Sequence, residues 1–344
     1  MAQPNPRAQA LTHYFSNEYN FEPENYIAGV ILYKRRNAQG VVERIVVKHA
    51  VQPLSGQMDR DEENFLRRLW GSEHTIRLIS VIDDRDHRAP VTWAEPLNRN
   101  LLNPPPILPW KLRVDPVRYP NAAGVAFFVM EYLERGTGDH LIERCQAMNI
   151  VEISEPLLWS FFLCLTRACV GMAYPPNRRN RNPPAVEREA LPRGRPRPAP
   201  KGVQVIDFGM TYEYDTPPQA QMENMRFVGE LMHQLACVAQ DEVLDDEYKP
   251  RYLVRNVPGL GDFETYASED FWRDQNLSFD FKLLVSRCMA VNEAIHPTVA
   301  PVLEICERNV GLTPNWMNLA DEVSEIFDTV PLDEDSDSGS EYEP

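Results

Sequence analysis

The sequence has no long hydrophobic run. Its longest apolar stretch, Ala122–Met130, contains nine residues, whereas a helix that crosses a bilayer needs about 20. The first fifteen residues (MAQPNPRAQALTHYF) also lack the apolar core of a secretory signal. We therefore expect no membrane-spanning segment, no membrane partner, and a location in the cytoplasm or the nucleus.

The six cysteines lack the spacing of a metal site or a disulfide framework. No two of them form a CxxC pair, and no pair of histidines matches them at metal-ligand spacing. Free thiols are usual in a reducing compartment, which agrees with a cytoplasmic or nuclear location. The cysteines stand at positions 145, 164, 169, 237, 288 and 306.

The chain has fewer basic than acidic residues. Lys and Arg number 35 against 51 Asp and Glu, which gives the 344-residue chain a formal net charge of −16. A general nucleic-acid binder needs a basic surface, so we expect no such activity. The rest of the composition is that of a globular protein, with 43% hydrophobic and 25% charged residues.

Four segments have the composition of irregular or disordered chain. Residues 1–25 are polar and predict a flexible lead-in, and residues 83–122 contain eight prolines and predict an insertion. Residues 175–201 combine eight prolines with eight basic and two acidic residues, and residues 331–344 carry six acids and no base. The basic insertion has three interpretations: a disordered surface loop, a patch for nuclear localisation or an acidic partner, or a segment that associates with the acidic tail.

Between these segments, the apolar pattern predicts strands first and helices later. Alternation predicts strands over residues 26–49 with a turn at 37–40, and a 3.6-residue period predicts a helix over 60–70. Further strands are expected at 76–82, 124–133 and 203–206, a buried helix from Pro156 to Met172, and helices through 224–330. This order predicts an α+β fold in two lobes.

The order of several short motifs is specific. Lys48 ends a strand, Glu62 lies on the next helix, and Asp207 opens an Asp-Phe-Gly triplet after a later strand. The segments IVVKHA, DEENFLRRLW, EHTIRLISV, FFVMEYL and VQVIDFGM resemble the motifs of a protein kinase, in kinase order and at kinase spacing. The resemblance extends over residues 26–310, and runs such as GMAYPP and FGMTYEYDTP are similar to fungal kinase-like proteins.

The resemblance implies a site for ATP and Mg²⁺. Lys48 matches the lysine that holds the nucleotide phosphates, and Glu62 matches its helical partner, with Glu63 as the competing choice. Asp207 matches the Mg²⁺ ligand, and Phe208 would pack behind it.

The resemblance also implies the domain boundaries and the adenine contacts. A β-rich N-lobe with the hinge would occupy residues 26–133, and a larger helical C-lobe residues 134–330. Met130 would be the gatekeeper, and backbone groups of Glu131 and Leu133 would face the adenine.

The glycine-rich loop departs from the kinase pattern. At its three glycine positions the chain has Glu24, Tyr26 and Gly29, so only the third glycine remains. Glycines let the backbone approach the phosphates closely. We therefore expect Gly29 to contribute to a weakened phosphate site.

The catalytic loop departs further. No aspartate lies between Asp139 and Asp207, and no histidine lies between His140 and His233. The base that accepts the substrate hydroxyl proton is therefore missing, and general-base catalysis contributes about 10²–10⁴-fold. Asn224 stands where kinases have an aspartate that anchors this loop, an APE motif is missing, and an expected RPT motif begins with His296.

These departures predict no catalytic residue and a degenerate protein kinase-like protein, a pseudokinase. Such a protein would bind ATP weakly and act through protein partners. Two alternatives stay open. One is an active Ser/Thr kinase whose catalytic loop has been lost from this sequence, and the other is an interaction scaffold that binds no nucleotide.

Overall fold

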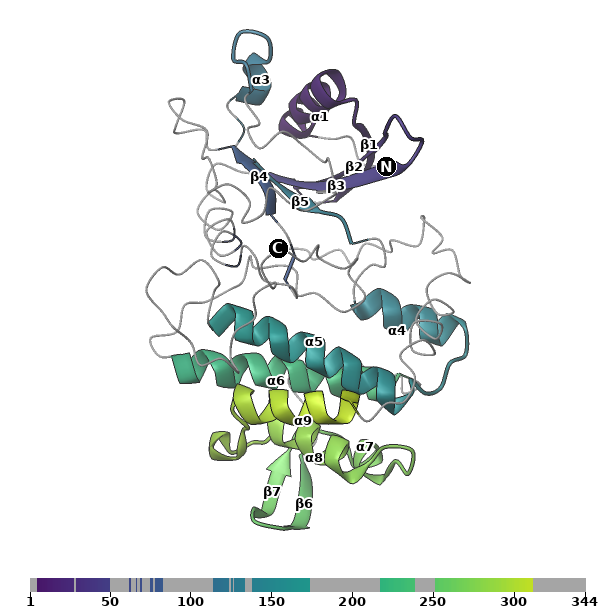
Figure 1. Ribbon diagram of the computed structural model, residues 1–344, viewed down its shortest axis with the longest axis vertical. Coiled ribbons are helices and arrows are strands. Elements are labelled where there is room, and N and C mark those ends of the chain that lie inside the picture. Colours follow the sequence, from purple (N-terminus) through teal and green to yellow (C-terminus); the bar gives the residue numbers. More distant parts are fainter. Residues whose placement is uncertain are drawn as a thin grey trace. The chain divides into compact units, whose positions relative to one another are not determined.

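The chain divides into two compact units, and the first extends from the N-terminal region to Leu133 (Figure 1). The computed structural model describes residues 5–27, 29–49, 62, 66, 69, 75–76, 78–82, 114–123, 125, 127–133, 138–173, 217–238 and 251–311. Unit 1 comprises the described residues up to 133, and unit 2 those from 138 onward. The expected segments 175–201, 203–206 and 331–344 lie outside the described residues.

Unit 1 is built on a five-stranded antiparallel sheet with the strand order β1-β2-β3-β5-β4. The strands are β1 (Glu22–Ile27), β2 (Val30–Arg36), β3 (Val42–His49), β4 (Leu78–Ile82) and β5 (Phe127–Glu131). The expected turn at residues 37–40 is present, and the Asn37 side chain accepts hydrogen bonds from the backbone of Gln39 and Val41. A second turn, which contains Gly29, lies between β1 and β2.

A helix at the N-terminus covers one face of this sheet. Helix α1 (Pro6–Tyr19) begins with the Asn5 side chain accepting from the Ala8 N–H, and it ends at Asn20 in a left-handed conformation. These are standard helix-capping devices. Its buried residues pack against buried residues of β2, β3 and β5 (Figure 1). The buried residues of α1 are Ala8, Leu11, Tyr14 and Phe15.

The expectation of a flexible lead-in over residues 1–25 is therefore wrong for residues 5–25. Polar side chains dominate the segment, but Leu11, Tyr14 and Phe15 recur at helical spacing and are fully buried. The aromatic rings of Phe15 and Tyr33 lie 5.0 Å apart between centroids. This packing makes α1 and β1 part of unit 1, which begins well before residue 26.

The end of the expected 83–122 insertion is also part of the core. Residues 83–113 lie outside the described residues, but residues 114–119 lead into a short helix, α3 (Pro120–Ala123). Tyr119 is buried, its hydroxyl donates to Glu18 of α1 at 2.7 Å, and Arg118 pairs with the same carboxylate at 2.5 Å. The contacts of Tyr119 and Arg118 with Glu18 therefore stabilise the position of α1 in unit 1.

Unit 2 is mainly helical. Its longer helices are α4 (Gly138–Ala147), α5 (Glu155–Ala173), α6 (Pro217–Ala236), α8 (Phe279–Cys288) and α9 (Val299–Gly311), with shorter helices α7 (Glu269–Arg273) and η3 (Glu293–Ile295). Helix α5 packs against both α6 and α9, and α6 packs against α8. The expected buried helix from Pro156 to Met172 is confirmed by α5. It is apolar on most sides because it lies among other helices.

A β-hairpin interrupts the helical region that was expected over residues 224–330. Strand β6 (Tyr252–Val257) pairs with β7 (Gly261–Thr265), so the expectation of continuous helices is wrong here. The connection contains Pro258, and Asn256, Gly259 and Gly261 have positive φ angles. Such residues favour a turn and oppose a helix.

The described residues form a mixed α+β fold, as the sequence predicted. None of their helices is both long enough and apolar enough to span a bilayer. All six cysteines are free thiols.

Candidate functional site

Lys48 and Glu62 form an ion pair in unit 1. The Lys48 Nζ lies 2.6 Å from the Glu62 Oε2. The Glu62 side chain is 2% exposed and the Lys48 side chain 24%. A buried carboxylate needs a partner because desolvation penalises its charge, and Lys48 supplies one. The pair expected from the sequence is thus present, while Glu63 lies outside the described residues.

The strand pattern explains the position of Lys48. In β3, Ile45, Val47 and His49 are buried, and Ile45 and Val47 pack in the core beneath α1. Side chains alternate between the two faces of a strand, so Val46 and Lys48 point to the opposite face. Lys48 therefore lies on the face of the sheet that α1 does not cover.

The helical spacing explains the position of Glu62. Residues 62 and 66 are helical, and Leu66 and Leu69 are almost fully buried. Positions four and seven residues apart lie on one face of a helix. Glu62 thus shares the buried face of these leucines.

Met130 lies on the same face of the sheet as Lys48. Met130 is opposite Val46, and Phe128 is opposite Lys48, and residues directly opposite in a sheet point to the same side. Leu78 of β4 is opposite Met130 in turn. On this face of the sheet, the Lys48 ammonium group therefore has apolar neighbours, Val46, Phe128 and Met130. This arrangement suits a ligand that has a charged end and an apolar end.

The expected hinge residues follow directly. Glu131 is the last residue of β5, opposite Ile45, and Leu133 lies two residues beyond in irregular chain. Both are half-buried. Their backbone thus follows Met130 directly in the chain.

Gly29 lies in the turn between β1 and β2. Its φ angle is 89°, a conformation that favours glycine. Its carbonyl oxygen accepts a hydrogen bond from the His49 N–H at 2.8 Å. The turn is therefore held against the end of β3, next to Lys48.

The two residues at the missing glycine positions have structural roles. Glu24 accepts hydrogen bonds from Arg44 Nε at 2.8 Å and from Lys34 Nζ at 3.1 Å. The hydrogen bond from Arg44 holds the pKa of this carboxyl below its ordinary value, although burial acts in the opposite direction. The Tyr26 hydroxyl lies 3.0 Å from the Thr12 hydroxyl of α1. Neither side chain is free to contact a ligand without first losing these partners.

The other expected residues are only partly described. Asp207 and Phe208 lie outside the described residues. Asn224 lies within α6, and the His296 ring donates to the Ala290 carbonyl at 2.7 Å. Within the described ranges, no group of three or more His, Cys, Asp or Glu side chains could hold a metal ion.

Comparison of the sequence with models of known protein families gives no match, and comparison with curated proteins gives none either. Inferences about function therefore depend on the residues around Lys48 and on the order of the sequence motifs.

Proposed function

We propose that this chain is a degenerate protein kinase-like protein with the two-lobed kinase arrangement, which binds ATP weakly and acts by binding other proteins. The observation that carries the proposal is the ion pair between Lys48 on β3 and the helical Glu62. In protein kinases a lysine of the third strand and a glutamate of the following helix form such a pair, and the lysine contacts the nucleotide phosphates.

The geometry suits this role. Glu62 fixes the Lys48 ammonium at 2.6 Å, and the lysine keeps 24% of its side chain exposed. An oriented ammonium group attracts phosphate without having to be ordered on binding. Met130 and Val46 on the same face supply an apolar surface for a base, and Asp207 would be the ligand for Mg²⁺.

The absence of phosphoryl transfer follows from the sequence. With no aspartate from residue 140 to residue 206, the chain lacks the group that would accept the proton of a substrate hydroxyl. Lys48 and Glu62 can orient phosphates, but neither of them supplies this base.

A scaffold that binds no nucleotide is the second candidate. It is favoured by the pairing of Glu24 with Arg44 and Lys34, which holds the side chain at the first glycine position away from a ligand. In this case Lys48 and Glu62 would serve only the stability of unit 1.

Nucleotide binding separates the two candidates. We expect ATP with Mg²⁺ to raise the melting temperature of the full chain, and Lys48→Met to abolish this shift. Lys34→Met, which removes another lysine of the sheet, should retain it. No transfer of radiolabelled phosphate to the protein or to a general substrate is expected.

The Lys48→Met variant removes the cation that pairs with the buried Glu62 carboxylate, and breaking a buried ion pair costs about 3–5 kcal/mol. The double variant Lys48→Met/Glu62→Gln removes the charge and serves as the folded control. An ATP shift that survives in this double variant would overturn the proposed site. Turnover that disappears with Lys48→Met and with Asp207→Ala would show an active kinase.

A further inference from the structure

The hairpin of unit 2 has a strand with an open edge. Among the described residues β6 pairs only with β7, whereas Thr265 of β7 also forms a bridge with Ala290, which follows α8. Figure 1 shows β6 and β7 extending away from the helices of unit 2. The unpaired edge of a strand presents backbone N–H and C=O groups that can pair with another chain.

The hairpin is firmly anchored. Val254, Val257 and Phe263 are buried against Ala290. The Thr265 hydroxyl donates to the Ser286 carbonyl of α8 at 2.9 Å. The open edge of β6 therefore belongs to a hairpin that is held by buried apolar contacts and by a hydrogen bond to α8.

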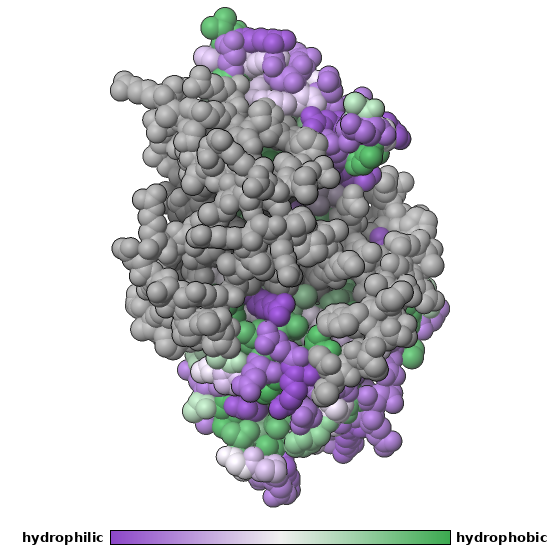
Figure 2. Space-filling view, viewed as in Figure 1, coloured by the Kyte–Doolittle hydropathy of each residue, from purple (hydrophilic) through white to green (hydrophobic). Residues whose placement is uncertain are grey.

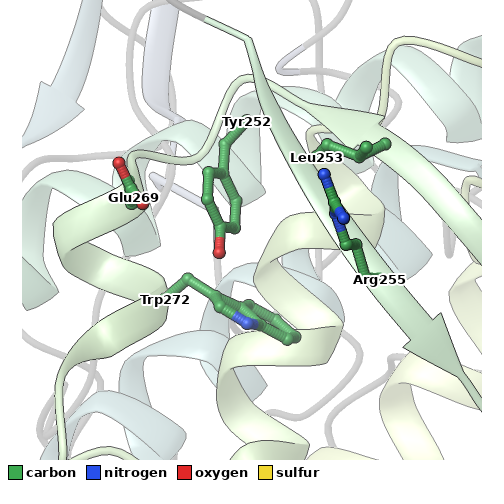
Figure 3. A pocket seen from close by; sticks show the side chains of 5 residues that line it. All are labelled: Tyr252, Leu253, Arg255, Glu269 and Trp272. Atoms are coloured by element: carbon green, nitrogen blue, oxygen red, sulfur yellow. The ribbon is translucent and has the colours of Figure 1, made fainter.

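A pocket of about 390 Å³ lies between β6 and α7. Figure 3 shows the ring of Tyr252 pointing toward the indole of Trp272. The Trp272 ring also contacts Phe279, with centroids 5.9 Å apart. The pocket is lined by Tyr252, Leu253, Arg255, Glu269 and Trp272.

Apolar side chains are exposed around this pocket. Leu253 is 39% exposed and Phe279 is 51% exposed. In Figure 2, green apolar residues lie among purple polar ones at the lower end of the view, where unit 2 is drawn. Exposed apolar groups rimmed by polar ones are typical of protein interaction sites.

Two charged residues line the pocket, Arg255 and Glu269, and they differ in their ion pairing. Glu269 pairs with Arg273 at 2.5 Å, and Arg251 pairs with Glu264 at 3.5 Å. Arg255 is exposed and makes no ion pair or hydrogen bond within the part of the chain that the structure describes. The group best placed to attract an added charge is therefore the Arg255 guanidinium.

We propose that the open edge of β6 binds an extended segment of another protein, which adds a strand to the hairpin and carries an apolar and an acidic side chain two positions apart. Leu253 and Arg255 are two residues apart and both are exposed. Leu253 lies in the regular part of the β6–β7 ladder, and Arg255 lies where its register shifts between Val254 and Val257. A strand added beside β6 would place an apolar residue next to Leu253, and an acid two positions along would be within reach of the long Arg255 side chain. The apolar side chain contacts Leu253 and the pocket, and the carboxylate pairs with Arg255.

This inference rests on the proposed function in one respect, that the protein acts by binding other proteins. It does not need a nucleotide in unit 1. Loss of ATP binding with intact peptide binding would remove only the nucleotide proposal, and the reverse result would remove only this inference.

The test uses the full chain and a fluorescein-labelled, N-acetylated seven-residue peptide, Thr-Val-Thr-Glu-Thr-Val-Thr, in which valine and glutamate stand two positions apart and so share one face of a strand. A peptide in which lysine replaces glutamate is the matched control. By fluorescence anisotropy we expect the glutamate peptide to bind about fivefold more tightly, as an exposed ion pair allows. Arg255→Glu should reverse this preference, while Arg308→Glu, at another exposed arginine of unit 2, should not.

Two further comparisons separate strand addition from simple adhesion. Leu253→Asp should weaken binding about tenfold through the loss of apolar contact, and Val151→Asp, at an exposed apolar residue elsewhere in unit 2, should leave it unchanged. Peptides N-methylated at either the odd or the even positions should differ, because only alternate N–H groups face the edge of a sheet. Equal binding of the two charged peptides, or of the two methylated ones, would overturn the proposal.

Discussion

Gly229 of α6 lies against Cys288 of α8 with no room for a side chain between them. A Cβ atom at position 229 would be 2.6 Å from the Cβ of Cys288 and 3.1 Å from the Cγ of Met289. Real Cβ atoms do not approach this closely, so the two helices cross at a distance that requires glycine.

Substituting Gly229→Ala should therefore destabilise unit 2. Overpacking of this kind costs about 1–3 kcal/mol, even though alanine favours a helix more than glycine does. The matched control is Gly138→Ala in α4, where the nearest atom, Cδ1 of the flexible Leu231, is 3.4 Å from the added Cβ. Urea unfolding followed by circular dichroism should show a lower midpoint for Gly229→Ala alone.

Removing the Phe15 side chain should destabilise unit 1. Phe15 is fully buried between α1 and the sheet, with ring contacts to Tyr33 and Phe127. Buried Phe→Ala substitutions cost about 3–5 kcal/mol. Phe227→Ala, at a phenylalanine that is 58% exposed on α6, is the control.

Hydrogen exchange locates the effect of the Phe15 substitution. Amides of β2 and β3 should exchange faster in Phe15→Ala, because the sheet loses part of the layer that covers it. Unchanged exchange in these strands would contradict the conclusion that α1 is part of the core of unit 1.

The sequence was informative where a local pattern coincided with the tertiary environment. Alternation in β3 predicted that Lys48 lies at the end of a half-buried strand, and the apolar run after Pro156 predicted α5. The pairing of Lys48 with Glu62 depended on the motif order, because an acid on an amphipathic helix is usually solvated. Its burial follows from sharing a face with Leu66 and Leu69.

Other elements could not be predicted because their stability comes from distant residues. The buried residues of α1 are few and stand among polar ones, and the helix is held by Tyr119, about a hundred residues later in the chain. The β6–β7 hairpin has a short apolar pattern that also fits a helix, and its anchor is Ala290 of a later segment. Tertiary contacts decided both structures.

The pairing of Glu24 with Arg44 makes the stability of unit 1 depend on pH. The hydrogen bond from Arg44 lowers the pKa of Glu24 from its ordinary value of 4.5. A carboxyl whose pKa is lowered by folding stabilises the protein above its ordinary pKa, and this contribution disappears as the pH falls through the folded-state pKa. Glu24→Gln should thus be less stable than the natural chain at pH 7, and the difference should shrink below pH 4.5.

The partner variant Arg44→Met tests the cause. It removes the donor that lowers the Glu24 pKa, so adding Glu24→Gln to it should change stability less than Glu24→Gln does alone. Urea titrations between neutral and acidic pH give both differences. Additive effects of the two substitutions at pH 7 would mean that the contact contributes nothing to the fold.

The reactivity of the six thiols should follow their burial. Cys145, Cys169, Cys288 and Cys306 are buried, while Cys164 and Cys237 are partly exposed. The thiolate is the reactive form, and burial raises the pKa of Cys288 to about 12. Burial also raises the pKa of Cys306.

In the native protein we therefore expect a disulfide reagent at pH 8 to modify at most two thiols quickly, and all six once urea has unfolded the chain. The double variant Cys164→Ser/Cys237→Ser should lose the fast phase entirely. A fast phase that persists in this variant would contradict the packing of α5, α8 and α9, because a buried thiol can react quickly only if the helices around it open readily.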